Sequence, residues 1–480
     1  MYVLCIFCVY CTASAVDWCD VVVQVTINTL PDDALLEIFD YCVLVNRMHG
    51  MEKKWYRLVH VCRKWRNVIF GSPLRLDLRL YCKARTPVRE TLNVWPLLPI
   101  VVWDGGHETV TWGMDNIIAA LEHSNRICQL DLYGISSLQY EEVFAAMQQP
   151  FPALTNLQLE HNYNSAPPII LPSFLGGSAP SLESLHLTRI PFPGLPKLLL
   201  SATHLVRLHL SNIPHSGYIS PETMVTCLPV LTRLKTLSIG FESSRSFPDR
   251  KRRYLRPQTR VLLPVLTELR FRGLSEYLED LIARLDAPLL DMLAITLFHQ
   301  LILETPQLTQ FISRTPEFKA HNEVHMVFSD WDVSVETYDG KLKLGMSCRQ
   351  SDWQLSSLEQ VCSSSFPRAF IPLVERVYIL EEGSSPPRSK DDIESSQWLE
   401  LLHPFTGVKG LYISREFAPL IVPALQELAG ERVTEVLPAL QTLFLEEKLL
   451  SASVQEGIGK FITARQLASH PVTISCWGRK

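Results

Sequence analysis

The first hydrophobic pattern with helical spacing lies at residues 30–42, LPDDALLEIFDYC. Pro31 fits the first turn of a helix, where its missing N–H costs nothing, and the two aspartates that follow complement the positive end of the helix dipole. Apolar side chains then recur at helical spacing, at Leu35, Ile38, Phe39 and Cys42. The pattern therefore predicts an amphipathic helix that begins close to Pro31.

A second amphipathic run follows at residues 55–70, WYRLVHVCRKWRNVIF, and the segment Gly71-Ser72-Pro73 ends it. One face of the expected helix carries apolar side chains, which are Leu58, Val61, Cys62, Trp65 and Ile69. A module this small cannot bury all of its apolar side chains by itself, so we expect a partner surface. A generic helical hairpin that packs on the rest of the chain is the simpler alternative.

Farther along the chain, a different pattern repeats: apolar-x-x-apolar-x-apolar. It begins at residues 127, 154, 182, 205, 234, 266 and 290, and it resumes at 374, 408 and 440. Within each unit the last two apolar residues alternate as in a short strand, with one outward residue between them. The stretches between units can form helices. Strands and helices that alternate at this period predict an α/β fold with a parallel sheet covered by helices.

Two segments interrupt the repeats, a basic loop at 241–257 and a hydrophilic insertion at 381–396. The basic run could serve as a nuclear-import signal or as a contact with an acidic partner, and the simpler interpretation is a solvated loop without such a function. Between residues 315 and 361 the repeat fades. There, residues 318–328 and 341–346 read as strands, with a hairpin turn expected at Asp339-Gly340.

The two N-terminal runs resemble the F-box, a three-helix module that docks on the Skp-type adaptor of a cullin RING ubiquitin ligase. The resemblance covers residues 27 to 74 and rests on LPDDALLEIFDY at 30–41 and LVHVCRKWR at 58–66. It implies that the adaptor-facing or module-core residues are Leu30, Pro31, Leu35, Ile38, Phe39, Val61, Cys62 and Trp65. The link at 43–55 is longer than is usual in the family, which can weaken or reshape docking.

The repeats resemble leucine-rich repeats, which have a period of about 20 to 29 residues. They depart from that family in detail, because its characteristic asparagine is present only as Asn162. The order of F-box and degenerate repeats is similar to that of the large F-box families of mushroom-forming fungi. The resemblance implies a small three-helix F-box module followed by an irregular leucine-rich-repeat-like α/β solenoid with a parallel sheet. A mixed α/β domain with accidental matches is the alternative.

These patterns divide the chain into four parts. The expected parts are an apolar tail at 1–26, the F-box-like module at 27–82, a connecting segment at 83–119 and the repeat solenoid at 120–480. The tail ends in Ala13-Ser14-Ala15, the small-residue spacing of a signal-peptide cleavage site, but no Lys or Arg precedes its apolar part. It is also shorter than the roughly 20 residues of a membrane helix. We therefore expect a cytoplasmic or nuclear protein without a membrane partner, and secretion is the alternative.

Charge, cysteine content and motifs limit the functions that we expect of this protein. Lys and Arg total 45 against 50 Asp and Glu, so the net charge of −5 gives no general drive toward nucleic acid. Twelve cysteines in 480 residues are too dilute for a disulfide scaffold. The sequence contains no phosphate-binding loop, no nucleophile elbow and no zinc-protease motif. His321 and His325 stand four apart, but no further ligand pattern completes a metal site. We expect no enzyme, metal or cofactor.

The function that this resemblance implies is substrate recognition for a Skp-cullin-F-box ubiquitin ligase. The helical module would bind the adaptor, and through it a cullin, while the repeats capture a protein substrate. Candidate substrate-binding residues are the outward strand positions Gln158, His186, His209, Ser238, Arg270 and Tyr412. Two alternatives are a non-catalytic scaffold without ligase coupling and a secreted leucine-repeat binding protein.

Overall fold

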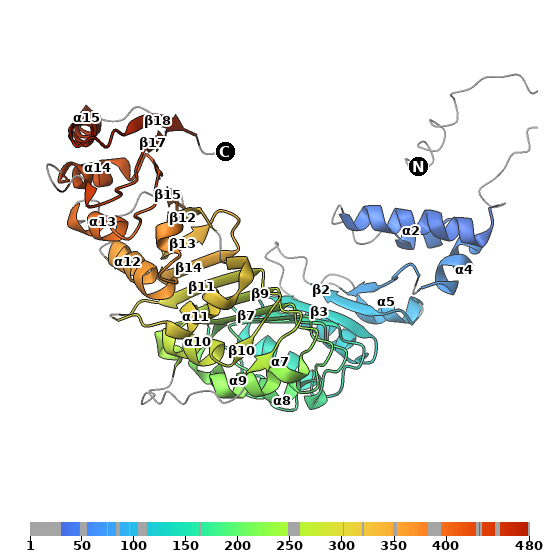
Figure 1. The fold of residues 1–480 in the computed structure, drawn as a ribbon. Helices are drawn as coiled ribbons and strands as arrows, with labels where there is room; N and C mark the ends of the chain where they lie inside the picture. The colour runs from blue at the N-terminus through green and yellow to red at the C-terminus, as the bar shows by residue number, and fades with distance from the viewer. Residues whose placement is uncertain are drawn as a thin grey trace, which may run out of the picture. The chain divides into compact units, whose positions relative to one another are not determined.

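The structure is a computed structural model (Figure 1). It describes residues 30–48, 55–73, 75–82, 87–95, 97–103, 113–162, 165–247, 260–300, 302–318, 321–348, 353–382, 395–428, 432, 434–446 and 452–478. The expected tail at 1–26, residues 49–54 of the link between the two N-terminal runs, and the centres of both insertions lie outside the described residues. The chain divides into two compact units, Met1–Leu80 and Tyr81–Lys480.

Three helices form the described part of the first unit. They are α2 (Asp32–Met48), α3 (Trp55–Val59) and α4 (Arg63–Gly71). The expected second helix is thus two helices, because Cys62 is extended and caps α4, its Sγ accepting the N–H of Trp65 at 3.5 Å. The rings of Phe39 and Trp65 lie 4.8 Å apart at the centre of the unit.

The second unit is built on one long sheet, which brings together sixteen strands of the described residues, most of them parallel. In spatial order the strands are β1 (Leu80–Cys82), β2 (Ile100–Trp103), β3 (Ile127–Tyr133), β4 (Asn156–Glu160), β5 (Ser184–Thr188), β6 (Arg207–Ile213), β7 (Thr236–Phe241), β9 (Glu268–Gly273), β11 (Met292–Phe298), β14 (Leu342–Ser347), β13 (Asp332–Thr337), β12 (Glu323–Phe328), β15 (Arg376–Glu381), β16 (Gly410–Ile413), β17 (Thr442–Glu446) and β18 (Thr473–Trp477). Strands β8 (Val261–Leu262) and β10 (Leu285–Asp286) form a separate parallel pair.

Helices follow the strands and cover one face of this sheet (Figure 1). They are α5 (Val88–Val94), α6 (Met114–Leu121), α7 (Ser137–Ala146), α8 (Leu195–Leu199), α9 (Pro221–Cys227), α10 (Ser275–Ile282), α11 (Pro306–Arg314), α12 (Gln354–Ser365), α13 (Ser395–Leu402), α14 (Ala418–Gln426) and α15 (Ala452–Leu467). In β4, Leu157 and Leu159 point to the helices and are fully buried, whereas Gln158 between them is half-buried on the other face. We call this second face the open face. The expected leucine-rich-repeat-like α/β solenoid is confirmed.

The fading of the repeat between 315 and 361 marks an antiparallel insertion. Strand β13 pairs antiparallel with β12 on one side and with β14 on the other, and these outer two pair in parallel with β15 and β11, respectively. The expected turn at Asp339-Gly340 joins β13 to β14, and Gly340 has a φ of 69°, which glycine adopts without strain. The sequence pattern did not predict β13, because its alternation DVSVET lacks leucine.

The repeat sheet also begins earlier than the pattern predicted. Residues 83–119 were expected to connect the two parts, but β2 lies within them and pairs in parallel with β3. Helices α5 and the first residues of α6 also lie in this segment. The strand was missed because its residues, IVVW, are apolar without the leucine spacing of the later units.

Candidate functional site

The candidate binding site is the open face of the long sheet. Strand register aligns one outward residue from each strand into a line that we call the central row. Five of the predicted substrate-binding residues are direct neighbours in this row, in the order Gln158, His186, His209, Ser238 and Arg270. The sixth, Tyr412, lies in the same row on β16, after the antiparallel insertion. All six of these side chains are half-buried or exposed.

The first part of the row is polar. The rings of His186 and His209 stack with centroids 5.4 Å apart and an angle of 29°. Burial lowers the pKa of both imidazoles, and the neighbouring His209 lowers the pKa of His186 further. Arg270 is exposed and pairs with Glu268 on the same strand. At neutral pH this part therefore presents two neutral imidazoles next to a paired guanidinium, a surface suited to hydrogen bonding.

The last part of the row is aromatic. Tyr378 stacks on Tyr412 with ring centroids 3.9 Å apart, and Tyr412 stacks on Phe444 at 4.1 Å with an angle of 1°. Trp477 lies edge-on to both tyrosines at 5.8 Å. His325 touches the other end of the stack, 4.7 Å from Tyr378. We call the three stacked rings of Tyr378, Tyr412 and Phe444 the aromatic ladder. It follows from register, since Tyr378, Tyr412 and Phe444 are direct neighbours on β15, β16 and β17.

Sequence reasoning identified only Tyr412 in this ladder. The signal for the others was present, because the fifth residue of the units that begin at 374, 408 and 440 is aromatic each time. Comparing that position between units, and not within one unit, would have predicted the stack. Trp477 gave no such signal, since it belongs to a strand outside the repeat pattern. The ladder adds a half-buried apolar surface to a face whose other part is polar.

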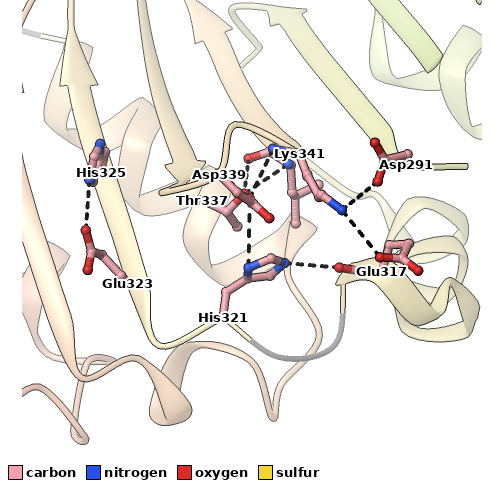
Figure 2. A network of polar contacts seen from close by, with 9 residues as sticks. Asp291, Glu317, His321, Glu323, His325, Thr337, Asp339 and Lys341 are labelled. Carbon is pink, nitrogen blue, oxygen red and sulfur yellow. Dashed lines mark hydrogen bonds and ion pairs between the residues drawn. The ribbon is translucent and has the colours of Figure 1, made fainter. Parts of the chain in front are cut away.

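A polar network lies at the turn between β13 and β14 (Figure 2). The Lys341 ammonium is 2.6 Å from the Asp291 carboxylate and 3.5 Å from that of Glu317. Asp339 accepts the Thr337 hydroxyl at 2.7 Å. Partial burial raises the pKa of Asp339, but this hydroxyl and the Lys341 N–H outweigh it, so that pKa is lowered. These contacts fix the turn that inserts β13 into the sheet.

The two histidines that stand four residues apart, His321 and His325, take separate partners (Figure 2). His321 lies near Asp339 and the Glu317 carbonyl, whereas His325 sits on β12 beside Glu323 at 3.4 Å. In the part of the chain that the structure describes, no group of three or more His, Cys, Asp or Glu side chains is arranged to hold a metal ion. Nor do these described residues include a helix with the length and apolar character needed to cross a bilayer.

The eight residues predicted to face the adaptor or form the module core differ in their burial. Leu35, Phe39 and Trp65 are buried inside the helical unit. The others are partly or fully exposed, and they are Leu30, Pro31, Ile38, Val61 and Cys62. Val61 is 56% exposed and lies in the turn before α4, not on a helical face as its spacing predicted.

The Lys64 side chain, in the first turn of α4, contacts the residues at the start of α2. Its ammonium donates to the Leu30 carbonyl at 2.6 Å and lies 3.6 Å from the Asp32 carboxylate. The start of α2 is therefore next to the start of α4. This brings the Leu30-Pro31 and Val61-Cys62 segments to one end of the unit, which we call the apolar end.

Comparison with known proteins does not assign the chain to a family. No family model matches it, and neither does any curated protein. Among solved structures it is similar to the leucine-rich repeat-containing protein LegL7 from Legionella pneumophila, with 14% sequence identity and a TM-score of 0.26 over 70% of this chain and 90% of that one. The repeat architecture itself is evident from the strand order and register of this chain.

Proposed function

We propose that this protein is a non-catalytic substrate-recognition subunit of a Skp-cullin-F-box ubiquitin ligase. The helical unit would bind the Skp-type adaptor, and through it a cullin, while the open face of the sheet binds a protein substrate. The protein would then act by proximity, since it raises the effective concentration of substrate lysines near the conjugating enzyme. The sequence resemblance of residues 27 to 74 to the F-box motivates this proposal.

The observation that supports it most directly is the apolar end of the helical unit. A small helical unit normally turns its large apolar side chains inward, as Leu35 and Phe39 do here. Val61 instead exposes 56% of its surface in the turn before α4, and Pro31 is exposed at the start of α2. Exposed apolar residues that cluster at one end favour a protein interface over an independent surface.

The free thiols support an intracellular location for this function. Within the described residues, the thiols of Cys227, Cys348, Cys362 and the exposed Cys476 are free. Unpaired cysteines are typical of reducing compartments, the cytosol and the nucleus among them. A secreted repeat protein, the alternative reading, would be expected to oxidise an exposed thiol.

The decisive experiment is copurification of the full chain with a Skp-type adaptor. Val61→Asp places a charge in the apolar end, and we expect it to lower adaptor affinity at least tenfold. Val94→Asp is the matched control, because Val94 is 76% exposed on α5 in the second unit. The double variant Leu30→Ala, Pro31→Ala should also weaken binding. No adaptor binding by the wild type, or equal binding by Val61→Asp, would leave a repeat scaffold without ligase coupling as the better function.

A further inference from the structure

Three exposed arginines project from the open face of the sheet, on strands β6 and β9. Arg207 is an outward residue of β6, and Arg270 and Arg272 are outward residues of β9. Among the outward residues of β6, β7, β9 and β11, the one carboxylate is that of Glu268, which pairs with Arg270. Three cations against one carboxylate give this part of the face a charge of +2, on a chain with a net charge of −5. We call the three arginines the basic patch.

Arg272 is the member of the basic patch that is open to a ligand from both sides. Across the described ranges of the chain, its guanidinium forms no hydrogen bond and no ion pair, and it lies 6.0 Å from the centroid of the Phe298 ring. Its register neighbours are Gly240 on β7 and Thr296 on β11, which are both small. A side chain added at Gly240 would begin 3.6 Å from the Arg272 Cβ, so the glycine leaves this flank uncovered.

The charges of the other two arginines reach the same region of the face. His209 stands two residues after Arg207 on β6, in the central row. Burial lowers the pKa of the His209 imidazole, Glu268 opposes this effect, and Arg270 and Arg207 lower the pKa further. Both guanidiniums therefore act on one imidazole, which stays neutral at pH 7 and adds a hydrogen-bonding group to the patch without a charge.

We propose that the basic patch binds an acidic segment of a protein partner, through the carboxylates of aspartate or glutamate side chains. This proposal rests on the binding role of the open face given above and names the class of substrate that the face accepts. Guanidinium groups bind carboxylates through paired hydrogen bonds, which favours them over other cations for this contact. The net charge of the patch supplies the complementary attraction.

The spacing on β9 suits an extended segment. Arg270 and Arg272 are two residues apart on one strand, so their Cα atoms are separated by roughly 6.6 Å, which is also the spacing of alternate residues in an extended peptide. Acidic residues at alternate positions would therefore face the two arginines in turn. The outward residues that flank β9 on both sides are small and leave room for such a segment, and they are Ser238, Gly240, Ala294 and Thr296.

A nucleic acid matches this surface less well. Proteins that bind nucleic acid through its phosphates commonly make about 6 to 10 phosphate contacts. The patch offers three guanidiniums, and that of Arg270 is already paired with Glu268. Beyond the patch on either side, Glu160 on β4 and Glu336 on β13 bring carboxylates to the same face. A continuous polyanion would meet these carboxylates, whereas a peptide can carry its acidic residues only where the arginines stand.

The test is fluorescence anisotropy on the full chain, with a fluorescein-labelled peptide of alternating glutamate and alanine as the probe. We expect this peptide to bind, and a glutamine-alanine peptide of the same length to bind at least fivefold more weakly. Because surface charges are screened by salt, raising sodium chloride from about 50 to about 200 mM should weaken binding of the glutamate peptide at least threefold.

Two variants locate the binding on the basic patch. Arg272→Gln removes an exposed charge that has no ion pair to lose, and we expect it to weaken binding about twofold. The double variant Arg207→Gln, Arg272→Gln should weaken binding at least fivefold. The matched control is Arg368→Gln, because Arg368 is an exposed arginine in the turn between α12 and β15. It should bind the glutamate peptide as the wild type does.

Weaker binding by the double variant, with unchanged binding by Arg368→Gln, supports the assignment. Equal affinity for the glutamine peptide, or equal binding by the double variant and the wild type, overturns it. Tighter binding of a phosphoserine-alanine peptide would overturn the choice of carboxylates, and tighter binding of an oligothymidylate would overturn the choice of a protein partner. The measurement uses no adaptor, so a chain that fails to bind the adaptor can still bind the acidic peptide, and the reverse also holds.

Discussion

The carboxylate of Glu279, on α10, accepts the backbone N–H of Leu308, in the first turn of α11, at 2.9 Å. Its second oxygen accepts the N–H of Gln307 at 2.7 Å. A buried side chain of one helix therefore caps the next helix, whose own N-cap residue Thr305 makes no such bond. Caps of this kind couple neighbouring repeats, which otherwise interact only through packing.

Replacing Glu279 by Gln should destabilise the second unit. At pH 5 the Glu279 carboxyl is mostly neutral, because its pKa is raised to about 7, but both of its oxygens can still accept a hydrogen bond. The amide of glutamine has one acceptor oxygen, so one of the two N–H groups would face an NH2 group and lose its bond. An unsatisfied buried donor costs about 1 to 3 kcal/mol. Chemical denaturation at pH 5 measures the change, and Glu276→Gln on the same helix is the control, because Glu276 is exposed. Equal stability of the two variants would contradict the capping role.

The same residue should make stability depend on pH. Burial raises the pKa of Glu279 from 4.5 to about 7, against the opposing effect of its two N–H bonds. Since the folded-state pKa is the higher one, the favourable contribution is complete below pH 4.5 and is lost as the pH rises through 7. The full difference corresponds to roughly 3 kcal/mol. Denaturation curves between pH 4.5 and 8 should show this loss in the wild type and not in Glu279→Gln. If the stability of the wild type and that of Glu279→Gln changed with pH in the same way, this contribution of Glu279 would be excluded.

Arg465 on α15 is the buried cation of the last repeat. It is fully buried, and its guanidinium donates to the carbonyls of Leu437 and Leu440 at 3.3 and 3.2 Å. Arg465→Met would remove this donor from the Leu440 carbonyl, whereas the Leu437 carbonyl keeps the Leu440 N–H at 3.1 Å, so we expect a cost of about 1 to 3 kcal/mol. Lys460→Met on the same helix is the control, since the Lys460 side chain is 64% exposed. Thermal unfolding should separate the two variants, and similar melting temperatures would argue against a structural role.

The sequence was most informative about local strand periodicity. In the unit that begins at Leu154, alternation alone placed the apolar side chains inward and Gln158 outward, and the structure has that arrangement. Register between strands was not accessible in the same way, because it depends on turn lengths that differ from unit to unit. Strand β13 is an example, because the spacing of leucines along the chain does not indicate that this strand runs antiparallel to its neighbours.

The candidate site was predictable to a similar degree. Outward positions of the early units were named from spacing, and they are neighbours in the central row. The ladder required knowing that Tyr378 and Phe444 flank Tyr412, which is a statement about three separate strands. In the helical unit, the resemblance could not tell core from surface. Val61 and Trp65 share one apolar spacing, yet a cysteine cap between them leaves the first exposed and the second buried.

Tyr412 should stabilise the sheet through its position between two rings. Each stacked pair contributes about 0.5 to 1.5 kcal/mol beyond burial, so Tyr412→Leu should cost about 1 to 3 kcal/mol. Tyr412→Phe keeps both stacks and removes only the hydroxyl group, so its effect should be smaller. Urea denaturation of both variants measures the difference. If the two lose the same stability, stacking contributes nothing beyond the burial that leucine also provides.

Phe39 should control the stability of the helical unit alone. It is fully buried, and its ring contacts Trp65 at 4.8 Å, so Phe39→Ala removes the centre of a small core. Large-to-small changes of this kind cost about 3 to 5 kcal/mol, which is a large share of the stability of a unit this size. Hydrogen-exchange mass spectrometry should show faster exchange in α2 and α4, with the strands β4 to β7 unchanged. Tyr41→Ala on the same helix is the control, because Tyr41 is 70% exposed. Unchanged protection of α2 in Phe39→Ala would mean that the module does not depend on this pair of rings.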